Sequence, residues 1–94
     1  MRVRPAPGVV AAFVDADGYL ELRADSLAGP GRFRCGPVGT AMWIALRRHD
    51  GDAEVAAQVL AELWGTDPEN ARADLDIWID EMRDAGLLRV LPAP

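Results

Sequence analysis

The chain has 94 residues, of which 50% are hydrophobic and 27% are charged. This length and composition allow one small domain with a packed core and exclude a wholly disordered chain. Acidic residues outnumber basic ones 15 to 10, for a net charge of -5, and this disfavours a nucleic-acid partner because phosphate contacts need basic side chains. So small a domain has little room for both a substrate pocket and catalytic groups, so the composition favours a binding module over an enzyme.

Cysteine and histidine each occur once, as Cys35 and His49. A single cysteine forms no internal disulfide, and these two residues alone cannot complete a metal site. No apolar run approaches the roughly 18 residues needed to cross a bilayer, and the N-terminal stretch lacks the apolar segment of a secretion signal. We therefore expect a cytoplasmic protein with no cofactor, no metal and no membrane partner.

The first third of the chain has the pattern of a β-hairpin. Residues 9–14 are apolar and lead into the turn-forming run Asp15-Ala16-Asp17-Gly18. Residues 19–23 then alternate between apolar and polar side chains, which is typical of a half-buried strand. We predict that these two strands pair through the turn.

A third, shorter strand is predicted over residues 32–35. Residues 24–31, which include Gly29-Pro30-Gly31, are predicted to be a loop before it. Alternation places Phe33 and Cys35 on one face of this strand and its two arginines on the other. A short strand with charged side chains suits the edge of a sheet.

The rest of the chain is predicted to be helical, over residues 38–48, residues 53–64 and a third segment from Pro68 to just before Gly86. Asp52 and Asp67 are the expected N-caps of the second and third helices, and Thr66 with Glu69 offers an alternative capping box for the third. The apolar residues recur at helical spacing. The predicted core positions are Val38, Ala41, Met42, Ala45 and Leu46, then Val55, Val59, Leu60 and Leu63, and finally Ala71, Leu75, Trp78, Ile79 and Met82.

A short strand over residues 87–91 is predicted after the third helix. Three strands followed by three helices predict an α+β fold with a three-stranded antiparallel sheet. Within that class, the order favours a winged helix-turn-helix architecture.

Several short blocks of sequence, spread over about residues 9–91, follow one family pattern. They are Asp17-Gly18, Gly31-Arg32-Phe33-Arg34, Pro37-Val38-Gly39-Thr40-Ala41-Met42-Trp43, Asp52-Ala53-Glu54-Val55-Ala56, Asp67-Pro68-Glu69, Asp74-Leu75, Trp78-Ile79, Met82 and Gly86-Leu87-Leu88. Together they resemble the PqqD-like leader-recognition proteins, also called RiPP recognition elements. The resemblance identifies residues 1–94 as a single leader-peptide recognition domain.

The resemblance implies a non-catalytic protein that binds the leader of a ribosomally synthesised precursor peptide. The implied partners are that leader peptide and a leader peptidase or other tailoring enzyme of the same pathway. A Gly-Arg-Phe-Arg strand running into a helix with Trp43 is most similar to the stand-alone proteins of lasso peptide clusters. The chain differs from those relatives at Cys35-Gly36, where they often carry Leu-Asn. A PqqD-type chaperone for a radical-SAM enzyme is the alternative within the family.

The same resemblance implies that the leader is held as an extra strand against the third strand and contacts the third helix. An edge strand offers unpaired backbone groups to an extended peptide. The predicted leader-binding residues are Arg32, Phe33, Arg34 and Cys35 on the strand and Asp74, Ile77, Trp78 and Glu81 on the helix.

The chemistry of these residues has a functional and a structural interpretation. The strand arginines suit acidic leader residues, and an apolar Ile77 between Asp74 and Glu81 suits an apolar anchor and a basic leader residue. Alternatively, the arginines are the solvent face of an edge strand, and Ile77 is one of the exposed apolar residues that most proteins have. Trp43 is predicted to be a core residue.

Two further function classes compete with peptide binding. A winged-helix DNA-binding regulator would use the third helix for recognition, but its many acidic residues against only Arg72 and Arg83 would repel phosphates. A small enzyme would need a nucleophile with its base, a metal cluster or a phosphate loop, and the sequence contains none of these patterns.

Overall fold

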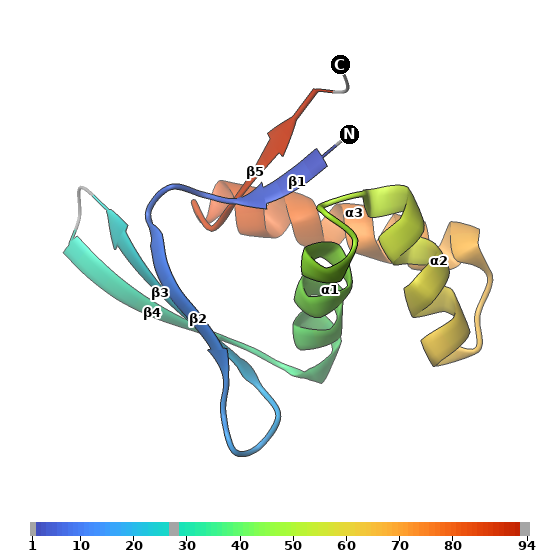
Figure 1. The fold of residues 1–94 in the computed structure, drawn as a ribbon, viewed down its shortest axis with the longest axis horizontal. Helices are drawn as coiled ribbons and strands as arrows, with labels where there is room; N and C mark the ends of the chain where they lie inside the picture. Colours follow the sequence, from blue (N-terminus) through green and yellow to red (C-terminus); the bar gives the residue numbers. More distant parts are fainter. Residues whose placement is uncertain (1, 27–28, 93–94) are drawn as a thin grey trace.

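A computed structural model describes residues 2–26 and 29–92 of the chain. The elements in chain order are β1 (Arg2–Pro5), β2 (Val9–Val14), β3 (Leu20–Ser26), β4 (Gly29–Cys35), α1 (Pro37–Arg48), α2 (Ala53–Trp64), α3 (Pro68–Asp84) and β5 (Leu88–Leu91) (Figure 1). Strands β2, β3 and β4 form an antiparallel sheet in that order. The predicted α+β class, with this sheet and three helices, is confirmed; the winged helix-turn-helix arrangement stays a prediction.

The hairpin of β2 and β3 turns where the sequence predicts it. The Asp15 carboxylate accepts hydrogen bonds from the backbone N–H groups of Asp17, at 2.9 Å, and Tyr19, at 3.0 Å. Gly18 has a φ of 83°, a conformation that glycine adopts without steric cost. Hydrogen bonds of this kind can be predicted from the sequence because the donor and the acceptor are only a few residues apart.

The predicted loop over residues 24–31 is wrong. Strand β3 continues to Ser26 and β4 begins at Gly29, with Ala24 paired to Gly31 and Asp25 to Pro30; residues 27–28 lie outside the described part. A proline has no backbone N–H to donate to a neighbouring strand. Because β4 is an edge strand, its outer side makes no hydrogen bonds to another strand, so a proline on that side removes none.

The two faces of the sheet differ in character. Residues that pair directly across antiparallel strands project from the same face. Leu22, which is buried, pairs with Phe33, so Phe33 belongs to the inner face that packs on the helices. Arg23 pairs with Arg32, and both belong to the outer face. The predicted separation of Phe33 from the strand arginines is confirmed.

The core lies where the inner face of the sheet, the three helices and β5 meet. Trp43 is buried, as predicted, and Trp78 and Cys35 are partly buried against the core. The fully buried side chains with the largest volume are those of Leu20, Leu22, Leu60, Leu75 and Leu87.

Three predicted core residues are exposed instead: Val38 by 57%, Val59 by 38% and Leu63 by 67%. Helix α2 packs through Leu60 and its small residues, which include Ala53, Ala56, Ala57 and Ala61. Alanine allows close approach of helix axes, so the buried face of α2 is rotated toward its alanines. A prediction that assigns the largest apolar residues to the buried face of α2 therefore selects the wrong side of the helix.

Thr40, in the first turn of α1, is the one buried polar residue of the described chain. Its hydroxyl accepts a hydrogen bond from the Leu20 backbone N–H at 2.8 Å and donates one to the Cys35 carbonyl oxygen at 3.3 Å. These bonds join α1 to the start of β3 and the end of β4. They fix the edge strand relative to the helices.

Two terminal strands complete the fold. The predicted strand near residues 87–91 is confirmed as β5, and it pairs with β1, which the sequence does not predict. Within residues 2–26 and 29–92, no helix has the length and apolar character that crossing a membrane would need.

Candidate functional site

Strand β4 has one side available to a further strand. Its inward side pairs with β3, and no other strand of residues 2–26 and 29–92 pairs with its outward side. The backbone N–H and C=O groups of that side are therefore open to an extended segment. Of the predicted residues here, Arg32, Phe33 and Arg34 are exposed and Cys35 is partly buried.

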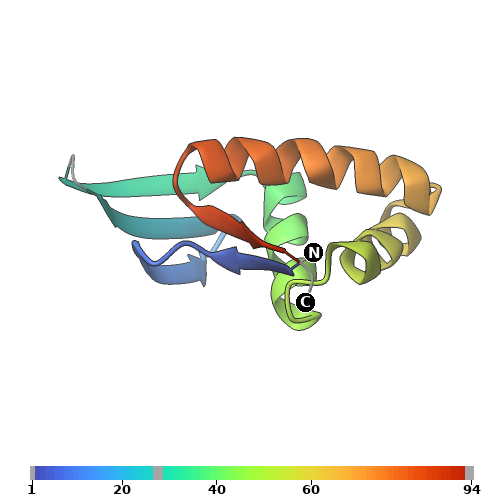
Figure 2. The same ribbon diagram turned by 90° about the horizontal axis from the view of Figure 1, so that it is seen from above.

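Helix α3 lies beside the end of this strand. Figure 2 shows α3 running along the same side of the molecule as β4, with α1 beginning between them. A β-carbon placed on Gly39, in the first turn of α1, would lie 3.0 Å from Trp78 Nε1 and 3.2 Å from the Cys35 β-carbon. The missing side chain of Gly39 thus lets Trp78 approach the end of β4. The structure brings Trp78 and Cys35 together, as the sequence-based site requires.

The side of α3 that carries Trp78 is negatively charged. Asp74 and Glu81 lie one helical turn before and after Trp78, and both are exposed. Neither takes part in an ion pair with another described residue, whereas Asp76 is bound by Arg72 at 2.9 Å and Asp80 by Arg83 at 3.2 Å. The arginines of α3 therefore neutralise other carboxylates and leave the Trp78 side acidic.

Ile77 is placed differently from the other predicted residues of α3. It is 59% exposed, as expected for a residue off the core. With 3.6 residues per turn, it lies almost opposite the buried Leu75 and points away from the core. It therefore belongs to the outer rim of the helix, and Asp74, Trp78 and Glu81 form the wall nearer β4.

The two strand arginines have different environments. The Arg34 guanidinium lies 3.0 Å from the Asp15 carboxylate and 3.3 Å from that of Asp17, and it stacks 4.4 Å from the centre of the Tyr19 ring. Arg32 has no carboxylate of the described chain within ion-pair distance. The role of Arg34 in ordering the β2–β3 turn was not predicted from the sequence, although hairpin pairing places the end of β4 beside that turn.

Cys35 has the character of a packing residue. Partial burial raises the pKa of its thiol, so the thiol stays protonated at neutral pH. A protonated thiol is a poor nucleophile. The geometry fits Cys35 as part of the wall between β4 and Trp78.

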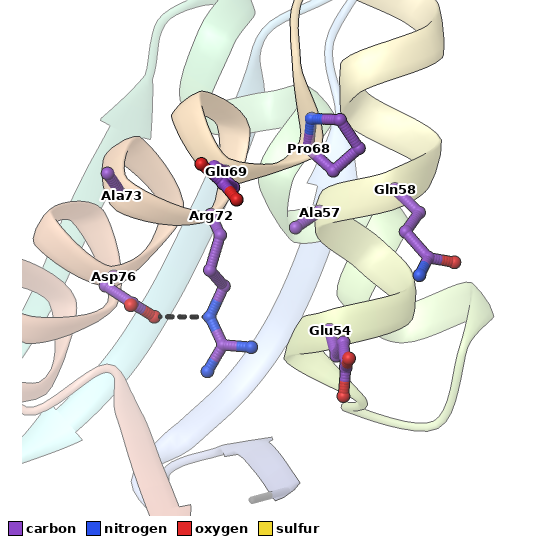
Figure 3. Close-up of a pocket in the computed structure, with 8 residues that line it drawn as sticks. All are labelled: Glu54, Ala57, Gln58, Pro68, Glu69, Arg72, Ala73 and Asp76. Carbon is purple, nitrogen blue, oxygen red and sulfur yellow. Dashed lines mark hydrogen bonds and ion pairs between the residues drawn. The ribbon is translucent and has the colours of Figure 1, made fainter.

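A separate pocket lies on the other side of α3, between that helix and α2. It has a volume of about 450 Å³ and a mixed polar and apolar lining. Figure 3 shows the Arg72 side chain extending into it from α3, held by Asp76, while Glu54 and Gln58 line it from α2. Within the described ranges, no group of three or more His, Cys, Asp or Glu side chains is placed to hold a metal. None of the predicted site residues lines this pocket.

A protein-family model matches the chain. It is the model described as Coenzyme PQQ synthesis protein D (PqqD), and it matches residues 26–88, which are 63 of the 94 residues. The chain belongs to the PqqD family. The matched region spans the edge strand β4 and all three helices, so it contains every predicted site residue. Comparison with curated proteins and with solved structures found no match.

Family membership supports a general role in binding a RiPP precursor peptide. PqqD-type domains are non-catalytic partner proteins with a general role in binding RiPP precursor peptides, and their partners are such a peptide and a modifying enzyme. The edge strand and the acidic side of α3 are accordingly the features to consider for the peptide.

Proposed function

We propose that this PqqD-family protein binds the leader of a lasso-type precursor peptide as an added strand along β4, and delivers it to a leader peptidase or other tailoring enzyme. The observation that carries the proposal is the free side of β4 beside the Trp78 side of α3. The lasso assignment is supported by the Gly31-Arg32-Phe33-Arg34 sequence that leads into α1 and Trp43.

In strand addition, backbone hydrogen bonds supply the affinity for the peptide, and side-chain contacts supply the specificity. Backbone hydrogen bonds to the outer side of β4 hold an extended peptide of almost any sequence. Side chains of the added strand then project alternately to the two sheet faces. Those on the inner face meet Phe33, Cys35 and Trp78, with Asp74 and Glu81 beyond, and those on the outer face meet Arg32. Ile77 and Arg34 are proposed to contribute at the rim only.

The test is amide hydrogen exchange by NMR, with and without a leader peptide from a lasso-type precursor. In β4, amides that point to β3 are already protected, whereas alternate amides point to the free side. Leader binding is expected to protect those alternate amides. Saturable binding without that protection would place the peptide elsewhere, and no saturable binding below about 100 μM would contradict the proposal itself.

Two other assignments compete with this proposal. The family description names coenzyme PQQ synthesis, which favours a radical-SAM partner as the second candidate. Co-purification with a leader peptidase, or with a radical-SAM enzyme, separates these two. A winged helix-turn-helix arrangement would make α3 a DNA-reading helix, but Asp74 and Glu81 lack ion pairs within the described chain and would repel phosphates.

A further inference from the structure

The outer face of the sheet carries two adjacent arginines at the edge. Arg23 and Arg32 are directly opposite each other in β3 and β4, and like charges in that position are destabilising. Both line a hollow of about 390 Å³ whose lining includes one carboxylate, that of Asp25. Among the described residues, no ion pair includes either arginine. The Arg23 guanidinium is held 5.8 Å from the centre of the Phe13 ring, which keeps it on this face.

Arg32 lies at the middle of β4, whereas Trp78 of the acidic wall lies near the C-terminal end of the strand. Arg32 faces the hollow, and Cys35, three residues later, is next to Trp78. Three residues of a strand span about 10 Å. An added strand therefore passes a basic site on one sheet face and then an acidic wall on the other.

We propose that the leader bound along β4 carries an acidic side chain that enters the hollow of Arg23 and Arg32, and a basic side chain that meets Asp74 and Glu81. This inference rests on the proposed function. Because the two sites belong to opposite faces, the acidic and basic residues must be an odd number of positions apart in the peptide, and the distance along β4 favours about three. The occupant is thus an extended peptide with opposite charges at a fixed spacing.

The experiment uses a library of random 12-residue peptides in mRNA display, selected on the full chain. Enriched peptides are expected to carry an acidic and a basic residue three positions apart. Selection on Asp74→Lys/Glu81→Lys is expected to lose the basic preference and keep the acidic one, and selection on Arg32→Glu is expected to do the reverse. Because the charges are exposed, resynthesised peptides should bind the double variant about tenfold more weakly, and less so in high salt.

A matched control is Glu62→Lys/Asp84→Lys, which makes the same change in net charge. Both residues are exposed, and neither takes part in an ion pair within the described chain. The control is expected to select the same peptides as the wild type. Enriched peptides without spaced charges, or an unchanged preference in Asp74→Lys/Glu81→Lys, would overturn this inference and leave strand addition standing. If no peptide is enriched by any variant or by the wild type, the proposed function itself fails.

Discussion

Thr40 is the residue whose substitution most directly tests how the edge strand is held. Thr40→Val keeps the shape of the side chain and removes the hydroxyl, so the Leu20 N–H loses an acceptor at 2.8 Å and the Cys35 carbonyl loses a donor at 3.3 Å. A buried donor left without a partner costs about 1–3 kcal/mol, and the longer bond to Cys35 adds little. We therefore expect the free energy of unfolding to fall by about 2 kcal/mol, and the Tm by about 8–16 °C for a domain of this size.

Urea denaturation measures this change, with an unchanged slope expected because the surface exposed on unfolding stays the same. Thr40→Ser is the matched variant, since it keeps the hydroxyl and loses one methyl group at a cost of about 1 kcal/mol. If Thr40→Val is as stable as the wild type to within about 0.5 kcal/mol, the hydroxyl does not join β3, β4 and α1 in the way described.

Two further predictions concern local features. Asp52 accepts hydrogen bonds from the first N–H groups of α2, at 3.1 Å and 3.2 Å, whereas the Asp67 side chain makes no such bond to α3. Asp52→Ala should therefore lower stability by about 1 kcal/mol and Asp67→Ala by much less, as chemical denaturation will measure; equal losses would contradict the assigned caps. The second prediction is a pH dependence. The Tyr19 N–H has the largest effect and lowers the pKa of Asp15 from its usual 3.8; burial, the second largest effect, raises it, and the Asp17 N–H and Arg34 lower it further, so the net shift is downward. A lowered carboxyl pKa stabilises the fold above 3.8, and this contribution is lost as the pH falls through the folded-state pKa. The stability difference between wild type and Asp15→Asn should thus shrink below pH 3.8, and a constant difference would refute the assignment.

The sequence predicts those parts of the fold that depend on neighbouring residues. The turn at Asp15 and Gly18, the cap at Asp52 and the start of α3 at Pro68 all appear where short-range patterns place them. The alternation of Phe33 with the strand arginines also holds, because side chains of a strand alternate whatever it packs against.

Long-range contacts account for the expectations that failed. Val59 and Leu63 are exposed because α2 turns its alanines toward the other helices, where their small side chains allow close packing. The spacing of apolar residues in the sequence does not show how closely two helices pack. The strands extend into the predicted loop because cross-strand pairing continues through Gly31 and Pro30.

Some features of the candidate site could likewise be predicted from the sequence, and others depend on the tertiary structure. Sequence alone determined the acidic balance, the family pattern and the residue types on β4 and α3. Only the tertiary structure decided that Arg34 binds the turn while Arg32 has no carboxylate of the described chain beside it, and that Gly39 lets Trp78 reach the end of β4. The physical reason is that charge and hydrophobicity belong to single residues, whereas a partner or an open side is set by elements distant in sequence that pack together.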